Sequence, residues 1–238
     1  MARALVAEGL GTALLLAVVV GSGIMGESLA GGNAAVALLA NSLATGAALV
    51  VLILVFGPIS GAHLNPVVTL SAAVRGRLAW ARVAPYVLAQ VAGAFAGVLL
   101  AHVMFGLPAF SASAHVRAGP GLLLSEVVAT FGLVLTILAV ERHRPAAVPH
   151  AVALYVVAAF WFTASTSFAN PAVTLARAAT ATFAGIRPAD VPGFVAAQLL
   201  GAAGAVALFD WLWSPRTAPA PAPAEATAVG PARAGSPS

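Results

Sequence analysis

Long runs of apolar residues, separated by short polar stretches, dominate the chain. Six of these runs reach the roughly 20 residues that an α-helix needs to cross about 30 Å of hydrocarbon. They occupy residues 4–22, 34–56, 82–104, 121–140, 148–166 and 192–213. Two further apolar stretches, 66–75 and 171–181, are too short to span a membrane. The pattern predicts an all-α membrane protein with six transmembrane helices and two short helices.

The two ends of the chain differ from the other segments in their sequence pattern. Residues 214–238 are rich in Pro and Ala without apolar periodicity, which predicts a disordered tail after a membrane domain at 1–213. The N-terminal run resembles a signal peptide, with Arg3 followed by apolar residues. Glu8 lies inside that run, however, and cleavage would leave an odd number of spans. We therefore interpret the run as the first transmembrane helix.

Composition agrees with a membrane protein, since 61% of the residues are apolar and only 8% are charged. Soluble domains carry about a quarter charged residues. The net charge of +4 comes from arginine alone, because the chain has no lysine. These arginines lie in the short gaps between apolar runs and do not form one basic stripe. Nucleic acid is therefore not an expected partner, whereas the lipid bilayer is an expected partner. The absence of cysteine excludes thiolate metal sites, disulfides and cysteine nucleophiles.

The arginines also predict an orientation, because cytoplasmic loops of membrane proteins are enriched in Lys and Arg. With six spans and a 66–75 stretch that enters and leaves on one side, eight arginines fall on that side and three on the other. The eight are Arg3, Arg75, Arg77, Arg82, Arg142, Arg144, Arg216 and Arg233, and the three are Arg117, Arg177 and Arg187. Both termini are therefore expected in the cytoplasm.

Three motifs occur twice, in the same order. AEGLGT, HLNPVVTL and PYVLAQVAGA in the first half correspond to SEVVAT, FANPAVTL and FVAAQLLGA in the second. The matched residues are Glu8 and Glu126, Asn65 and Asn170, and Gln90 and Gln198. Each half, about 4–104 and 121–213, contains three predicted spans. Because three is odd, the second half must be inverted relative to the first, an arrangement that places broken helices near the bilayer midplane.

Each half contains one Asn-Pro pair. Asn is a favoured N-cap and Pro is favoured at the first helical position, so Asn65-Pro66 and Asn170-Pro171 predict the starts of two short helices. Inverted copies would meet near the middle of the membrane with both positive helix ends directed at one point. Such a point repels cations and accepts neutral hydroxyl-bearing solutes. The alternative, a cap of a surface helix in a loop, is hard to reconcile with two matched copies.

The stretches SGAHLNPVVTL and SFANPAVTLAR resemble the two signature loops of the aquaporin (major intrinsic protein) family, and the likeness covers about residues 4–213. The resemblance implies six spanning helices, two re-entrant half-helices and a homotetramer with one pore in each subunit, without a cofactor or enzymatic activity. The first motif usually ends in Ala where this chain has Val67. The motif residues are Asn65, Pro66, Val67, Asn170, Pro171 and Ala172.

The resemblance also implies roles for three residues near these loops. Glu8 and Glu126 would accept hydrogen bonds that hold the loops in shape, since a carboxylate in a span costs about 2.5–3.5 kcal/mol without partners. The alternative is that each Glu offsets a helix dipole at the membrane interface. His63 has no second ligand at metal-binding spacing, so it is read as a loop-packing or pore-lining residue, and no metal site is predicted.

The narrowest point of family members is lined by four side chains, one of them an Arg directly after the second Asn-Pro-Ala. Here that position is Val173, and ungapped distances assign Thr45, Ala158 and Ser167 to the other three. The ring is small, uncharged and wider than usual. Arg177, one helical turn after Val173, either adds a positive charge about 6 Å nearer the outer mouth or snorkels to the interface.

The resemblance therefore implies a passive channel for small uncharged solutes in a bacterial inner (plasma) membrane. The stretch 170–194 resembles a subgroup associated with arsenic resistance, so neutral metalloid acids such as As(OH)₃, glycerol-like solutes and water are the expected permeants. The alternatives are a water- or glycerol-selective channel and a secondary transporter. A transporter would carry an acid at the midplane, whereas both intramembrane acids lie near the starts of spans.

Overall fold

Residues 1–213, the part of the chain that this computed structural model describes, form eight α-helices and three 3₁₀ turns, with no strand among them. The long helices are α1 (Ala2–Leu29), α2 (Ala34–Ser60), α4 (Val83–Met104), α5 (Pro120–His143), α6 (Val148–Phe162) and α8 (Val191–Trp213). The short ones are α3 (Pro66–Val74) and α7 (Pro171–Arg177). The 3₁₀ turns Trp80–Arg82, Pro145–Ala147 and Pro188–Asp190 lead into α4, α6 and α8. The tail expected at 214–238 lies outside the described residues.

Six helices are long and apolar enough to cross a membrane, which confirms the predicted number of spans. Four helix ends differ from the prediction by four residues or more, among them that of α2, which continues to Ser60 instead of residue 56. Helix α1 continues to Leu29 instead of residue 22, because apolar runs mark the hydrocarbon layer and not the end of the helix. Helix α6 stops at Phe162 instead of residue 166, because the next residue, Thr163, adopts an extended conformation. Helix α7 stops at Arg177 instead of residue 181.

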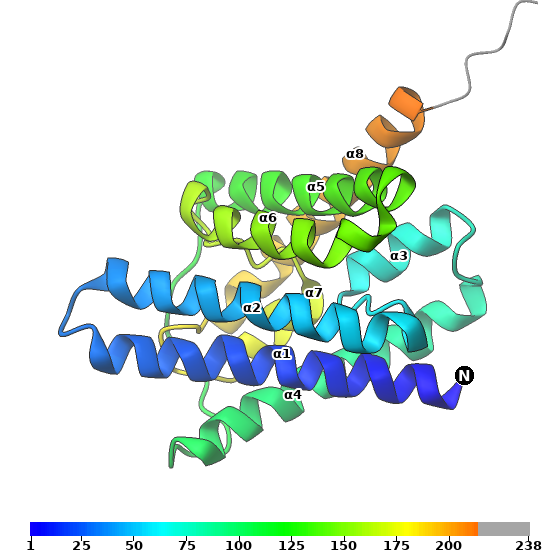
Figure 1. Ribbon diagram of the computed structural model, residues 1–238. Coiled ribbons are helices and arrows are strands. Elements are labelled where there is room, and N and C mark those ends of the chain that lie inside the picture. The colour runs from blue at the N-terminus through cyan, green and yellow to red at the C-terminus, as the bar shows by residue number, and fades with distance from the viewer. Residues whose placement is uncertain (214–238) are drawn as a thin grey trace, which may run out of the picture.

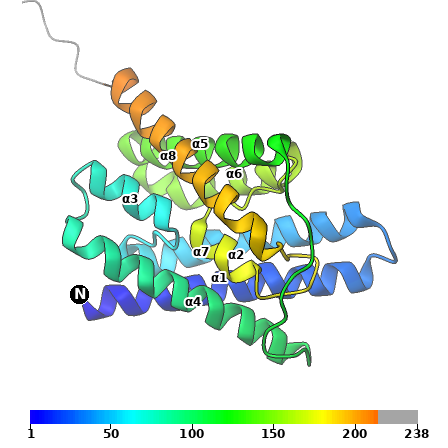
Figure 2. The same ribbon diagram turned by 180° about the vertical axis from the view of Figure 1, so that it is seen from behind.

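Figures 1 and 2 show how the helices pack. Helix α1 lies beside α2 and α4, α5 lies beside α6 and α8, and α2 contacts α6 across the two halves. The short helices α3 and α7 begin near the centre of the bundle and run toward opposite ends of it (Figure 1). The N-terminus and the last turn of α8 lie toward the same end. The chain therefore has the predicted inverted arrangement of two half-helices.

Glycines bring the crossing helices into backbone contact. A Cβ atom at Gly93 of α4 would lie 2.1 Å from the carbonyl oxygen of Gly9 in α1. The matched position in the second half, Gly201 of α8, would place its Cβ 2.4 Å from the carbonyl oxygen of Val127 in α5. Gly204 differs, because its nearest neighbour would be 3.5 Å away. Small residues at Gly93 and Gly201 thus set how closely each pair of helices approaches.

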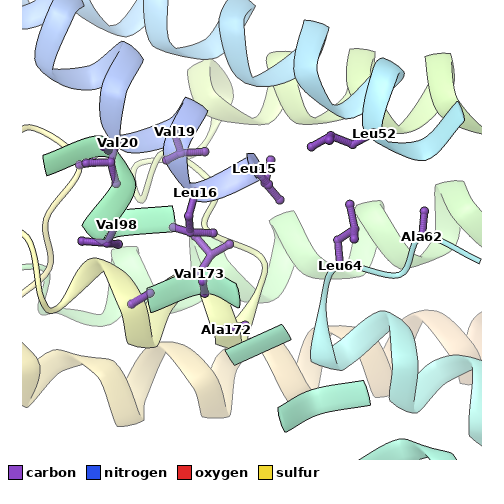
Figure 3. Close-up of a cluster of buried hydrophobic side chains, with 14 of the residues drawn as sticks. Leu15, Leu16, Val19, Val20, Leu52, Ala62, Leu64, Val98, Ala172 and Val173 are labelled. Carbon is purple, nitrogen blue, oxygen red and sulfur yellow. The ribbon is translucent and has the colours of Figure 1, made fainter. Parts of the chain in front are cut away.

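The main hydrophobic core joins the first half to the start of α7. In Figure 3, side chains of α1 and α4 gather against Ala172 and Val173, the first residues of α7 after Pro171. Leu52 of α2 and Leu64 of the loop before α3 complete this cluster. The labelled side chains from α1 and α4 are Leu15, Leu16, Val19, Val20 and Val98. This packing fixes the position of α7 inside the bundle.

Candidate functional site

The two asparagines of the Asn-Pro pairs lie at the point where α3 and α7 meet. The Asn65 amide nitrogen donates a hydrogen bond to the Ala169 carbonyl oxygen at 2.8 Å, and the Asn170 amide nitrogen donates to the Leu64 carbonyl oxygen at 2.8 Å. Each asparagine therefore bonds to the residue that precedes the other. Since an amide nitrogen carries two hydrogens, each has a second donor left for the cavity that both residues line.

Both asparagines also cap their helices, as the sequence predicts. The side-chain oxygen of Asn65 accepts a hydrogen bond from the Val67 N–H at 3.0 Å. The side-chain oxygen of Asn170 accepts from the Ala172 N–H at 3.0 Å and the Val173 N–H at 3.3 Å. Capping fixes both side chains with the amide nitrogen directed away from the helix start. The positive ends of two helices and two amide donors are thereby brought to one place.

Glu8 is fully buried and holds the first loop. One carboxylate oxygen accepts hydrogen bonds from the Ser60 hydroxyl at 2.6 Å and the His63 N–H at 2.9 Å. The other accepts from the Leu64 N–H at 2.7 Å and the Gln90 side-chain amide at 2.8 Å. Four donors compensate a buried charge that would otherwise be costly. The interface alternative for Glu8 does not fit this environment.

Glu126 has the matched position in the second half and is also fully buried. Its oxygens accept from the Phe168 N–H at 2.9 Å, the Ala169 N–H at 2.9 Å and the Gln198 side-chain amide at 2.6 Å. The contacts of the two halves thus correspond, with Gln198 in the place of Gln90. Both glutamates are part of the scaffold of the loops and neither lines the cavity.

The bonds to these glutamates hold the loops in a conformation that L-residues avoid. Leu64 and Ala169, which supply the carbonyl acceptors for the two asparagines, have φ values of 51° and 46°. Ala62 and Ser167 occupy the same left-handed region two residues earlier in each loop, at 46° and 51°. This region costs a non-glycine residue about 1–2 kcal/mol. The buried carboxylates stabilise the loops against that cost.

His63 lines the cavity, and its Nδ1 lies 3.1 Å from the Thr69 hydroxyl. Its ring also lies 5.5 Å from the ring of Tyr86, centre to centre. The residue therefore both packs the loop and faces the lumen, the two roles expected from the sequence. Within residues 1–213, no group of three or more His, Cys, Asp or Glu side chains is placed to hold a metal ion.

A cavity of about 960 Å³ passes the asparagine pair. At the end of the bundle toward which α3 runs, four arginines and Glu141 line it. Beyond the asparagines it extends along α7 as far as Arg177. The four arginines are Arg3, Arg75, Arg77 and Arg82. The lumen thus has a basic entrance and a mostly apolar wall with few polar groups along it.

Three of the four expected filter residues line this cavity, namely Thr45, Ser167 and Val173. Ala158 does not line it, and its side chain is exposed on the outside of the helix. The lumen-facing residues of α6 follow a spacing of four, through Val156 to Phe160. Because two helical positions turn by about 200°, Ala158 points away from that face. The assignment of Ala158 was wrong, and Phe160 contributes the side chain from α6.

The hydroxyl groups of Thr45 and Ser167 have no hydrogen-bond partner among the described residues, although both side chains are buried. Buried hydroxyls normally find a partner. Both residues line the cavity, but their hydroxyl oxygens are themselves almost inaccessible to a water molecule. Val173 and Phe160, also cavity-lining, supply apolar surface at the same site.

Arg177 is buried, with 3% of its surface exposed, and it lines the cavity. Its Nε donates a hydrogen bond to the Ala184 carbonyl oxygen, and its guanidinium carbon lies 3.4 Å from the centre of the Phe168 ring. The alternative of a snorkelling arginine is therefore wrong. The guanidinium lies against Phe168, the residue that follows Ser167 in the second pore loop.

Arg117, in the link between α4 and α5, is a residue of the site that no sequence pattern indicates. Its Nε donates to the Gly185 carbonyl oxygen at 2.8 Å, and its guanidinium carbon lies 4.9 Å from the centre of the Phe168 ring. Burial lowers the pKa of Arg117 to about 10, which leaves the side chain protonated at neutral pH. Two cations therefore lie against one phenyl ring, Phe168. These contacts join residues far apart in sequence, and no periodic pattern marks them.

Comparisons with known proteins agree with this geometry. The family model described as "Major intrinsic protein" matches residues 1–146. Aquaglyceroporin AqpS of Rhizobium meliloti (strain 1021) is 60% identical over 215 residues, which are 90% of this chain and 92% of that protein. A glycerol uptake facilitator protein of Streptococcus pneumoniae (strain ATCC BAA-255 / R6) is 42% identical over 106 residues, 40% of this chain and 45% of that one.

Among solved structures, the aquaglyceroporin from Plasmodium falciparum matches with a TM-score of 0.66 and 20% identity, over 89% of this chain and 95% of that one. This similarity supports the fold. The family model covers more than half of the chain, and the relative from Rhizobium meliloti extends the likeness over most of it. With its six membrane helices, two half-helices and paired asparagines, the chain belongs to the major intrinsic protein family of channels.

Proposed function

We propose that this channel conducts small neutral hydroxyl-bearing solutes, including water, glycerol-like polyols and neutral metalloid acids such as As(OH)₃. One observation carries the proposal. Where family members have an arginine after the second Asn-Pro-Ala, this chain has Val173, which lines the lumen together with the small side chains of Thr45 and Ser167. The 60% identity to a protein named as an aquaglyceroporin supports a permeant larger than water.

The proposed filter consists of Thr45, Phe160, Ser167 and Val173. The small side chains of Thr45, Ser167 and Val173 leave room for a polyol or a metalloid acid, and Phe160 and Val173 offer apolar surface to its carbon or metalloid centre. Glycerol and As(OH)₃ both present several hydroxyls around a small, less polar core, so both suit a lumen of this mixed character. At the asparagine pair, the remaining amide donors and the two helix ends favour neutral oxygen-bearing molecules over cations.

Orientation and assembly are further parts of the proposal. The N-terminus and the connections α3–α4 and α5–α6 lie toward one end of the bundle, where the arginines are concentrated (Figure 1). The positive-inside rule assigns this end to the cytoplasm of a bacterial plasma membrane, with both termini there. A homotetramer would cover part of the outer apolar surface, as the family resemblance implies. Native mass spectrometry of the detergent-solubilised protein would measure the subunit number.

Solute uptake by proteoliposomes tests the proposal. Vesicles with the protein should take up glycerol and As(OH)₃ faster than empty vesicles, in proportion to the concentration gradient and without saturation. Val173→Arg should slow both solutes more than it slows water, because it narrows the filter. Val173→Leu is the matched control, since it adds a single methylene and no charge. Uptake of water alone would overturn the proposal in favour of a water-selective channel.

A further inference from the structure

Arg177 has an environment that is unusual for an arginine. It is 3% exposed, it lines the lumen, and it takes part in no salt bridge among residues 1–213. Only its Nε has a protein acceptor there, the Ala184 carbonyl oxygen. The terminal guanidinium nitrogens have none within the described residues, and they do not belong to the buried polar atoms that lack a partner. These N–H groups are thus accessible donors inside the cavity.

The Arg177 guanidinium is held in place by two contacts, and one of the two contacting groups is itself fixed. The Ala184 carbonyl accepts from Nε on one edge, and the Phe168 ring lies 3.4 Å from its central carbon. Phe168 is in turn fixed by a Glu126 hydrogen bond to its backbone N–H and by the Arg117 guanidinium, 4.9 Å from the ring centre. An arginine over an aromatic face is attracted by the ring quadrupole, more strongly when both are desolvated. The charge is therefore fixed in position.

Arg117 is anchored by the second half of the chain. Its backbone N–H donates to the Asp190 carboxylate at 2.8 Å, and its side chain donates to the carbonyl oxygens of Gly185 and Ser165 at 2.8 and 3.3 Å. The Asp190 carboxylate is itself paired with Arg187 at 2.6 Å. Asp190 is thus already paired, and Glu126, the buried carboxylate that acts on both guanidinium groups, forms no salt bridge with either of them among residues 1–213.

The location of the charge follows from the direction of side chains on helices. Side chains lean toward the N-terminus of their helix, so the guanidinium of Arg177 is carried back along α7 toward Val173. Phe168, which it contacts, directly follows the filter residue Ser167. A solute passing Thr45 and Ser167 therefore meets this guanidinium before it reaches the asparagine pair, or just after leaving it.

We propose that Arg177 is the cationic specificity residue of this pore, and that Phe168 and Arg117 are positioning residues for it. Arg177 supplies the fixed positive charge and the N–H donors that Val173 lacks. Because its side chain approaches the lumen from one turn farther along α7, it leaves the space around Val173 open. The pore thus combines a wide filter with a charge that repels Na⁺ and protons and donates to oxygens of neutral solutes. This inference rests on the proposed channel function.

Cation leak into proteoliposomes is the measurement that tests Arg177. Arg177→Met should raise Na⁺ and proton leak roughly 15-fold. That factor corresponds to the repulsion between two unit charges about 10 Å apart at an effective dielectric constant of about 20. Arg177→Lys should restore part of the exclusion, since it keeps the charge but loses the flat contact with Phe168. Arg144→Met is the control, because Arg144 is exposed and does not line the cavity. It should leave both leak and glycerol uptake unchanged.

A double variant separates loss of charge from loss of structure. Val173→Arg combined with Arg177→Met moves the charge by one turn, and it should restore cation exclusion while it slows glycerol. A single variant Arg177→Met that excludes Na⁺ and protons as well as the parent protein would overturn the inference. Glycerol uptake by the parent protein is read in the same vesicles. Its absence would refute the proposed function, whereas uptake with an unaltered leak in Arg177→Met would refute this inference alone.

Discussion

Replacing Glu126 by Gln tests whether a buried carboxylate holds the second pore loop. The substitution keeps the shape of the side chain but exchanges one accepting oxygen for an NH₂ group. In the least damaging orientation, that group replaces the oxygen that accepts from the Phe168 N–H, so two donors face each other. The other oxygen keeps its bonds from the Ala169 N–H and the Gln198 amide, now without a negative charge.

The expected loss of stability follows from these three bonds. Leaving the buried Phe168 N–H unpaired costs about 1–3 kcal/mol, and weakening two charge-assisted bonds to neutral ones costs about 1 kcal/mol each. Part of this is recovered, because a buried charge no longer has to be desolvated. We expect a net destabilisation of about 2–4 kcal/mol. For a chain of this size that corresponds to a midpoint lower by roughly 4–16 °C.

The midpoint is measured as the fraction of protein that remains soluble and monodisperse after heating in detergent. Glu141→Gln is the matched control, because that carboxylate pairs with Arg77 at an exposed site. An exposed pair contributes about 0–1 kcal/mol, so this control should shift the midpoint by only a few degrees. If Glu126→Gln were as heat-resistant as Glu141→Gln, the loop would not depend on the buried carboxylate and our account of it would be wrong.

Three other substitutions should have graded effects in the same heating assay. Gly201→Ala brings a Cβ to 2.4 Å from the Val127 carbonyl oxygen and should cost about 1–3 kcal/mol, whereas Gly204→Ala, with its nearest neighbour at 3.5 Å, should be neutral or slightly stabilising. Equal effects would show that α5 and α8 can separate freely. Thr174→Val removes a hydroxyl that bonds to Asn170 and Gln198, but both keep other partners, so the cost should be only about 0.5–1.5 kcal/mol. A larger loss than for Glu126→Gln would contradict the view that the carboxylate is the main support of the loop.

Much of the fold is readable from the sequence because the bilayer imposes simple rules on it. A span must be apolar over a fixed length, so hydropathy reveals six of them. The family resemblance implies that Glu8 and Glu126 hold the loops, and their matched positions in the two halves favour that role. The Asn-Pro pairs predict the starts of the two short helices, because Asn caps a helix and Pro is favoured at its first position. Each of these signals is local or is repeated in both halves.

The parts of the site that were missed depend on contacts between distant segments. The assignment of Ala158 rests on counting back from Asn170. However, α6 ends at Phe162, and the extended link after it determines which face of α6 lines the lumen. The burial of Arg177 depends on Phe168 and on Arg117, a residue of the link between the two halves. Because an arginine in a short polar gap normally reaches water, neither residue could be placed from its neighbours in sequence.

The crossed amide bonds between the two halves have a consequence for how the protein is made. When the first half enters the membrane, the carbonyl that Asn65 needs belongs to residue 169 and has not yet been synthesised. An amide without a hydrogen-bond partner in hydrocarbon costs free energy, so the first loop cannot reach its final conformation before the second loop is in the membrane. Biogenesis should therefore finish with a single late event that completes both loops together, and the two halves made as separate polypeptides should assemble by the same exchange of bonds.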